Sequence, residues 1–279
     1  MEYQILMDSC GEVTDEMKSL GVISSIPLTL QVGDVEITDD ETFNQTKFVE
    51  LVASTDACPR SACPSPELYK SAFRADTKRI YIITLSANLS GSYNSAALAK
   101  SLAAGKDATE QIHIFNSCSA SVGQTLIARK VIECEELGMS FEETVRTVEE
   151  YIDSMNTVFV LEDLSFLQRN GRLTGLKYIA ASLLHILPIL AATPEGTIYQ
   201  LGQARGVKKA MAELLDNVLK FAENSKPSRF YISYCNSLDR AEFLRDKINE
   251  KYPAAEIKLL DMRGVSTMYA GNRGIIVAF

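Results

Sequence analysis

Histidine is scarce in this chain, whose 279 residues include only His113 and His185. His113 lies in a stretch that predicts a β-strand and His185 in the longest apolar run, so we expect both to be core residues. The sequence also lacks the Gly-x-Ser-x-Gly motif that presents the nucleophile of α/β-hydrolases. A serine nucleophile needs an adjacent base. We therefore expect a protein that is not an enzyme and has no catalytic residues.

Motifs for metals and nucleotides are missing as well. The sequence has no Cys-x-x-Cys pair, no His-Glu-x-x-His motif and no calcium-loop pattern. It also lacks the Gly-x-x-x-x-Gly-Lys-Ser/Thr motif of phosphate-binding loops and the Gly-x-Gly-x-x-Gly fingerprint of dinucleotide-binding folds. We expect no metal site and no cofactor.

A broad excess of positive charge is absent: 28 Lys and Arg stand against 36 Asp and Glu, for a net charge of −8. Such a surface is poorly suited to nucleic acid or anionic lipid. The longest apolar run, residues 179–192, is too short for a membrane span and contains Ser182, His185 and Pro188. The amino-terminal segment carries polar residues where a signal peptide is apolar. We expect a cytoplasmic chain with no nucleic-acid partner and no stable membrane insertion.

The six cysteines are scattered along the chain rather than clustered. Cys118 and Cys134 lie in segments that we expect to be buried, where an unpaired cysteine behaves as a small hydrophobic residue. The spacing therefore favours reduced thiols over a disulfide framework.

Strand and helix patterns alternate through the first half of the chain, which predicts an α/β fold with a parallel sheet and helices on both faces. From Val158 the pattern changes, and Pro194-Glu195-Gly196 between two apolar stretches predicts a hairpin and hence a mixed sheet. We place a boundary between a first domain, 1–155, and a second, 156–279. Expected strands include 3–7, 26–32, 111–115, 159–161, 188–192, 197–201, 229–234, 256–260 and 275–279; expected helices include 44–53, 140–155, 163–168, 176–184, 207–223 and 239–252. The acidic stretch 34–42 is expected to be a solvated hairpin or loop.

The stretch 81–100 combines a buried strand, a loop of small polar residues and a helix rich in Ala and Ser. A loop between the carboxyl end of a strand and the amino end of a helix gathers hydroxyls and free N–H groups around one point. We predict that it binds a carboxylate or phosphate, with counter-charge from Arg172 or Arg205. Taken singly, each serine can also be a helix cap or turn residue. The candidate binding residues are Ser61, Ser86, Ser90, Gly91 and Ser92, with Ser117 as a further candidate.

Several motifs, in order along nearly the whole chain, resemble those of the DegV family of bacterial fatty-acid-binding proteins. They are Asp8-Ser9-Cys10, Pro59-Arg60-Ser61-Ala62-Cys63-Pro64-Ser65-Pro66, Ser86-Ala87-Asn88-Leu89-Ser90-Gly91-Ser92-Tyr93, Asn116-Ser117, Leu164-x-x-Leu167-x-x-Asn170-Gly171-Arg172-Leu173 and Leu187-Pro188-Ile189-Leu190. The resemblance implies a two-domain DegV-like fold, with the second α/β domain built on a mixed sheet. It also implies an acyl chain buried between or within the domains.

By motif position, the resemblance implies that hydroxyls of Ser61, Ser86, Ser90 and Ser92 hold the carboxylate of a long-chain fatty acid. Some family members hand the acid to a separate fatty acid kinase for phospholipid synthesis. Arg205 stands where the family carries an arginine, which implies contact with the headgroup or the kinase. Tyr269 replaces the family's histidine near the headgroup, and a phenol donates a hydrogen bond but does not titrate near neutral pH.

Three functions are open at this point. The first is a fatty-acid carrier, with a fatty acid kinase catalytic subunit as a partner to which it presents its ligand. The second is an enzyme acting on a small phosphorylated or carboxylated substrate, with Asp8 or a serine as catalytic group. The third is a regulatory binding protein for another lipid-like ligand. A long apolar cavity favours the carrier, and a short polar cleft favours the enzyme.

Overall fold

The computed structural model describes residues 2–103, 111–173 and 186–279. The helix expected at 176–184 and the placement of His185 lie outside these ranges. Within them, no helix is both long and apolar enough to cross a membrane.

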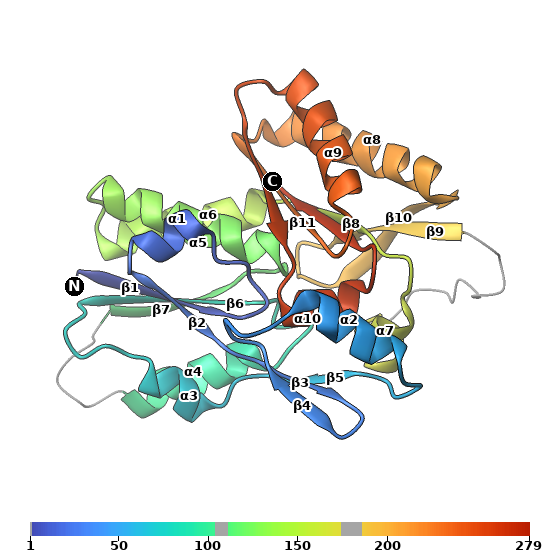
Figure 1. The fold of residues 1–279 in the computed structure, drawn as a ribbon. Helices are drawn as coiled ribbons and strands as arrows, with labels where there is room; N and C mark the ends of the chain where they lie inside the picture. The colour runs from blue at the N-terminus through green and yellow to red at the C-terminus, as the bar shows by residue number, and fades with distance from the viewer. Residues whose placement is uncertain (1, 104–110, 174–185) are drawn as a thin grey trace.

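A parallel sheet organises the first half of the chain, and its strands run in the order β2-β1-β6-β7. The strands are β1 (Tyr3–Asp8), β2 (Ile23–Ile26), β6 (Arg79–Thr84) and β7 (Gln111–Asn116). On one face lie α1 (Asp15–Ser19), α5 (Val122–Glu136) and α6 (Phe141–Ser154); on the other lie α3 (Pro66–Ser71) and α4 (Ser92–Ala103) (Figure 1). The predicted parallel sheet with helices on both faces is confirmed.

Each face of this sheet has its own apolar core, because successive strand residues point to opposite sides. In β1, Ile5 packs with Ile127 of α5, whereas Leu6 packs with Ala96 and Ala99 of α4. Burial on both sides explains why the two central strands, β1 and β6, are nearly continuous apolar runs in the sequence. It also fixes the carboxyl ends of the strands, where the polar loops begin.

A mixed sheet forms the second half, in the order β10-β9-β8-β13-β11-β12. Only the β11–β12 pair is parallel, so the predicted mixed sheet is confirmed. The strands are β8 (Thr157–Val160), β9 (Ile186–Ala192), β10 (Ile198–Arg205), β11 (Arg229–Tyr234), β12 (Glu256–Asp261) and β13 (Ile275–Ala278), with α8 (Val207–Ser225) and α9 (Leu238–Lys251) packed on one face. Gly196, at φ +78°, turns the predicted β9–β10 hairpin.

The single strand expected at 26–32 is wrong, because this stretch contributes to two sheets. β2 ends at Ile26, and β3 (Thr29–Val32) pairs with β4 (Val35–Thr38) and β5 (Arg60–Ala62) in a small antiparallel sheet. Pro27 lies between them and offers no backbone N–H to a ladder. β5 also gives regular structure to part of the proline-rich segment, where none was expected.

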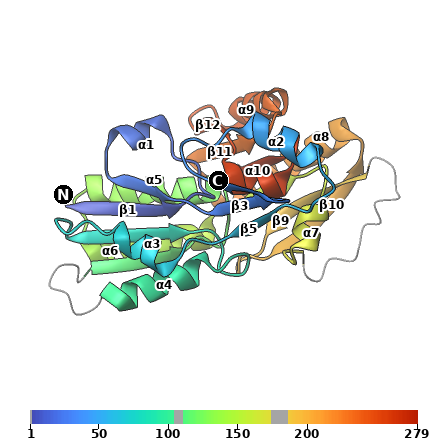
Figure 2. The same ribbon diagram turned by 60° about the horizontal axis from the view of Figure 1, so that its bottom comes forward.

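A helix that the sequence did not predict, α10 (Gly264–Ala270), packs beside α2 (Gln45–Ala53) and close to β3 (Figures 1 and 2). Val265 and Met268 share an apolar core with Leu30 and Phe48. The carboxyl-terminal part of the chain therefore packs directly on the small sheet. The boundary between 1–155 and 156–279 stays a prediction.

Candidate functional site

Three of the predicted site residues, from distant parts of the chain, meet at one point. The Ser61 hydroxyl of β5 lies 3.1 Å from the Tyr269 hydroxyl of α10. The guanidinium carbon of Arg172, just after α7 (Ser165–Arg169), lies 5.7 Å from the centroid of the Tyr269 ring, in cation–π range. We call Ser61, Arg172 and Tyr269 the hydroxyl–arginine cluster.

The charge of Arg172 is not neutralised by any carboxylate in the described part of the chain. Its Nε donates to the Leu89 carbonyl oxygen at 3.2 Å, and its Nη1 donates to the carbonyl oxygen of Asn170. Both acceptors are neutral, so they orient the guanidinium without cancelling its charge. A carboxylate or phosphate beside Arg172 would gain a charge-assisted hydrogen bond.

Tyr269 is a neutral donor in this cluster. Burial raises the pKa of its phenol, while the Ser61 hydrogen bond and the Arg172 charge act in the opposite direction. The phenol therefore stays protonated at neutral pH. It supplies an O–H group whose protonation does not change over the physiological range.

A mainly apolar cavity adjoins the cluster, and both Arg172 and Tyr269 line it. Leu85 and Leu89 line it from the loop after β6. The remaining apolar wall includes Phe159 of β8, Ile198 of β10 and Ile276 of β13. The cavity thus lies between the loops of the parallel sheet and a face of the mixed sheet, with a cation and a phenol in its wall.

The serines of the β6–α4 loop divide into two kinds. Ser86 and Ser92 are fully buried and already bonded within the protein. The Ser86 hydroxyl donates to the Gly196 carbonyl at 2.7 Å and accepts from Asn88 N–H at 3.2 Å, so it ties this loop to the β9–β10 hairpin. The Ser92 hydroxyl donates to Asp8 at 2.6 Å and lies 2.6 Å from the Tyr69 hydroxyl.

Ser90 and Gly91 are more open to solvent. The Ser90 hydroxyl accepts from Ser92 N–H at 3.2 Å, which leaves its own O–H to donate. A side chain at Gly91 would approach the Cys63 sulfur to 3.2 Å, so the loop passes close to the segment after β5. Ser117 is buried and donates to the Ser119 carbonyl oxygen at 2.9 Å.

Arg205 lies apart from the cavity wall. It ends β10 on the solvent side, opposite Ile186, and does not line the cavity. His113 does not line the cavity either: its Nε2 lies 2.8 Å from a Glu149 carboxylate oxygen, in a half-buried pair between β7 and α6.

Asp8, the alternative catalytic group, is fully occupied by the protein's own donors. Its carboxylate accepts from Leu85 N–H at 2.9 Å, Gln124 Nε2 at 2.9 Å, Ser92 Oγ at 2.6 Å and Cys10 N–H at 3.3 Å. Burial raises the pKa of Asp8, and these hydrogen bonds oppose the rise. Asp8 joins the carboxyl end of β1 to the loop after β6 and does not line the cavity.

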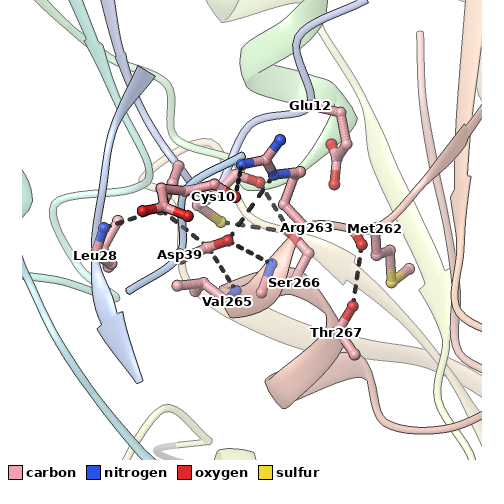
Figure 3. A network of polar contacts seen from close by, with 12 residues as sticks. Cys10, Glu12, Leu28, Asp39, Met262, Arg263, Val265, Ser266 and Thr267 are labelled. Atoms are coloured by element: carbon pink, nitrogen blue, oxygen red, sulfur yellow. Dashed lines mark hydrogen bonds and ion pairs between the residues drawn. The ribbon is translucent and has the colours of Figure 1, made fainter. Parts of the chain in front are cut away.

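The acidic stretch 34–42 is part of a mostly exposed hairpin, as expected, but Asp39 is an exception because it is 0% exposed. Its carboxylate accepts from the backbone N–H groups of Gly264 and Val265, at 2.8 and 2.9 Å, at the start of α10. Figure 3 shows Asp39 beside Val265. Sequence reasoning missed Asp39 because it lies among exposed acids. The alternating Val35 and Ile37 are the one local signal of a strand leading into the fold.

The remaining acidic and cysteine side chains lie outside the hydroxyl–arginine cluster. Glu12 is also buried, and burial raises its pKa to about 8 despite a hydrogen bond from Ser121. In the described ranges no three His, Cys, Asp or Glu side chains are grouped to hold a metal ion, and the six cysteines are free thiols.

The fold and the site define an α/β protein in which a cation and hydroxyls adjoin an apolar cavity. The DegV family profile, described as an uncharacterised protein family, matches residues 2–279. This chain belongs to the DegV family. A DegV domain-containing protein of Streptococcus gordonii is 31% identical over 282 residues, covering 100% of this chain and 99% of its relative.

Two solved structures extend the comparison. A DegV family protein from Ruminococcus gnavus, refined with vaccenic acid, is 45% identical, covers 99% of each chain and has a TM-score of 0.94. The Streptococcus pneumoniae fatty acid kinase (Fak) B3 protein, loaded with linoleic acid, is 31% identical, covers 100% of this chain and 99% of its own, and has a TM-score of 0.89. The two-domain α/β architecture of these structures matches the two large sheets described above.

Proposed function

We propose that this chain binds a long-chain fatty acid, with its carboxylate at the hydroxyl–arginine cluster and its acyl chain in the adjoining cavity. The observation that carries the proposal is the position of Arg172: an un-neutralised guanidinium beside Tyr269, in the wall of an otherwise mainly apolar cavity. The fatty acids present in the Ruminococcus and Streptococcus structures support the same ligand class.

The two parts of the ligand contribute differently. Each buried methylene contributes about 0.8 kcal/mol, so a long acyl chain supplies most of the affinity. A hydrogen bond to a charged group contributes only about 1.5–3 kcal/mol. The cluster therefore discriminates an acid from its neutral analogues and orients the chain.

Within this proposal, the loop serines have distinct roles. Ser61 and Tyr269 donate to the carboxylate, and Ser90 adds a third donor from the β6–α4 loop. Ser86 and Ser92 hold that loop in place through Gly196 and Asp8. Gly91 permits the close approach of the loop to Cys63.

We further propose that the protein acts as a cytoplasmic carrier rather than an enzyme. Asp8, the candidate catalytic acid of the alternative, supports this view because it accepts four hydrogen bonds from the protein and lies away from the cavity wall. The likeness to the Fak B3 protein supports presentation of the bound acid to a separate fatty acid kinase. Arg205, exposed at the end of β10, is our candidate for contact with that kinase.

Binding is tested by isothermal titration of delipidated protein with dodecanoic acid and with dodecan-1-ol, which share an acyl chain and differ in the headgroup. The proposal predicts saturable binding of both ligands, with a preference for the acid of about tenfold or more. Equal affinities for the acid and the alcohol would contradict the proposal that the hydroxyl–arginine cluster binds the carboxylate. Absence of binding to either ligand would contradict the proposed ligand class.

A further inference from the structure

The position of Tyr269 depends on the short helix α10, which carries it. α10 spans only Gly264–Ala270, and a helix of this length does not hold its conformation without tertiary contacts. Most of its side chains are buried. What anchors α10 therefore decides where the Tyr269 hydroxyl stands relative to Ser61.

One carboxylate, from a residue 225 positions earlier in the sequence, anchors the first turn. Asp39 Oδ1 accepts from Gly264 N–H at 2.8 Å, and its Oδ2 accepts from Val265 N–H at 2.9 Å. These N–H groups belong to the first turn of the helix, where no intrahelical acceptor is available. The carboxylate satisfies both and complements the positive end of the helix dipole.

The same carboxylate joins α10 to the amino-terminal strands. Asp39 Oδ2 also accepts from the Ser9 hydroxyl at 2.9 Å, and that hydroxyl accepts from Leu28 N–H at 2.9 Å (Figure 3 includes Leu28 and Asp39). Ser9 follows β1 directly, and Leu28 lies between β2 and β3. Asp39 is thus the point at which the loop after β1, the small sheet and α10 are bonded together.

The fit of Gly264 against this carboxylate is close. A methyl group at Gly264 would lie 2.7 Å from both the Asp39 carboxyl carbon and its Oδ1. The residue at the start of α10 therefore has to lack a side chain for the carboxylate to reach the helix. A second contact holds the next part of α10, because the Ser266 hydroxyl donates to the Cys10 carbonyl oxygen at 2.8 Å.

We propose that Asp39 is a positioning residue for headgroup recognition: by fixing the start of α10 to the loop after β1, it sets the Tyr269 hydroxyl against Ser61 and the Arg172 guanidinium. Asp39 does not line the cavity and acts only through Tyr269. This inference rests on the proposed function, because it concerns how the same cluster recognises a carboxylate.

The test compares Asp39→Asn with its neighbour Asp40→Asn. An asparagine keeps the shape but replaces one acceptor oxygen with a donor, so one of the bonds to Gly264, Val265 or Ser9 is lost. The Asp40 side chain accepts hydrogen bonds from Thr42, whereas the Gly264 and Val265 N–H groups of α10 donate to Asp39. Both variants are titrated with dodecanoic acid and dodecan-1-ol, and the ratio of the alcohol Kd to the acid Kd is compared with that of the wild type.

The expected result is a fall in this ratio of about tenfold for Asp39→Asn, as the loss of about 1.4 kcal/mol in headgroup contact would produce. The alcohol Kd should stay within about twofold of wild type, and Asp40→Asn should leave the ratio unchanged. A loss of acid and alcohol affinity by the same factor would indicate a merely structural role and would overturn the inference.

Two further variants keep the test decisive if Asp39→Asn does not fold. Ser9→Ala removes one donor to Asp39 and leaves both helix N–H bonds, and Gly264→Ala displaces the helix start from the carboxylate. Each should lower the ratio while alcohol binding persists; unchanged ratios in both would overturn the inference. A wild-type protein with no preference for the acid would overturn the proposed function as well, whereas a wild-type preference that survives every variant would overturn this inference alone.

Discussion

The guanidinium of Arg172 lies over the ring of Tyr269, 5.7 Å from its centroid, although 97 positions separate the two residues along the chain. The contact places a fixed positive charge beside a neutral phenol in the wall of an apolar cavity. An amphiphilic acid is complementary to both features, because its charged end meets the guanidinium and its chain stays out of water.

Replacing Arg172 by Ala should weaken acid binding selectively. We expect the Kd for dodecanoic acid to rise about 10- to 100-fold, because a hydrogen bond to a charged group contributes about 1.5–3 kcal/mol. The Kd for dodecan-1-ol should change little. Isothermal titration measures both, and Arg169→Ala, an exposed arginine at the end of α7, is the matched control. Equal losses for acid and alcohol would contradict an electrostatic role for Arg172.

The acid affinity should be nearly independent of pH between about 6 and 9. Burial raises the pKa of Tyr269, so its phenol remains a donor over this range. A Tyr269→His variant should bind the acid more weakly as pH rises through about 6.5, where imidazole loses its charge. Fluorescence competition across this pH range distinguishes the two profiles. A wild-type affinity that varies as steeply as that of the variant would mean that another group controls headgroup binding.

Glu12 should make folding stability fall between about pH 4.5 and 8. Its folded-state pKa is raised to about 8, above the ordinary value of 4.5, so the folded protein holds a proton that the unfolded chain releases. This contribution is fully present below pH 4.5 and is lost as pH rises through 8.

The matched variant for this effect is Glu12→Gln, which carries no titratable proton. Chemical denaturation should show that the free energy of unfolding of the variant rises relative to that of wild type, by up to about 1.4 kcal/mol per pH unit between about pH 4.5 and 8. Above about pH 8 the difference between the two proteins should stay constant. Parallel stability profiles for the two proteins would show that Glu12 has an ordinary pKa.

The two kinds of loop serine should separate experimentally. Ser86→Ala removes the donor to the Gly196 carbonyl and should lower the free energy of unfolding by about 1 kcal/mol. Ser90→Ala should leave stability within about 0.5 kcal/mol and weaken acid binding about tenfold or more. Thermal unfolding and titration of both variants check this division. The reverse pattern, with Ser86→Ala affecting only binding, would contradict the assignment of roles.

Sequence patterns predicted the fold well where burial is regular. β1 and β6 are buried on both faces and were found from their nearly continuous apolar residues, and the Pro194-Glu195-Gly196 turn identified the β9–β10 hairpin. α10 was missed because it is short and buried on nearly all sides, which leaves no amphipathic pattern.

The sequence predicted which residues form the candidate site but not the hydrogen bonds that hold them in place. Ser61, Arg172 and Tyr269 came from motif positions, and the structure brings them together. The bonding of Ser86 and Ser92 within the protein could not be read from sequence, because a buried serine and a ligand-binding serine look alike. Asp39 was missed for a related reason: its partners are backbone N–H groups of Gly264 and Val265, and backbone groups leave no signature in the sequence.

The most direct test of the account is native mass spectrometry of the protein as purified from cells, with the released ligand identified by gas chromatography. Binding of a long-chain fatty acid predicts one additional mass per chain, corresponding to an unmodified fatty acid, and its loss on delipidation. A protein that purifies without such a ligand, and takes up none when the delipidated chain is incubated with long-chain acids, would contradict the central claim.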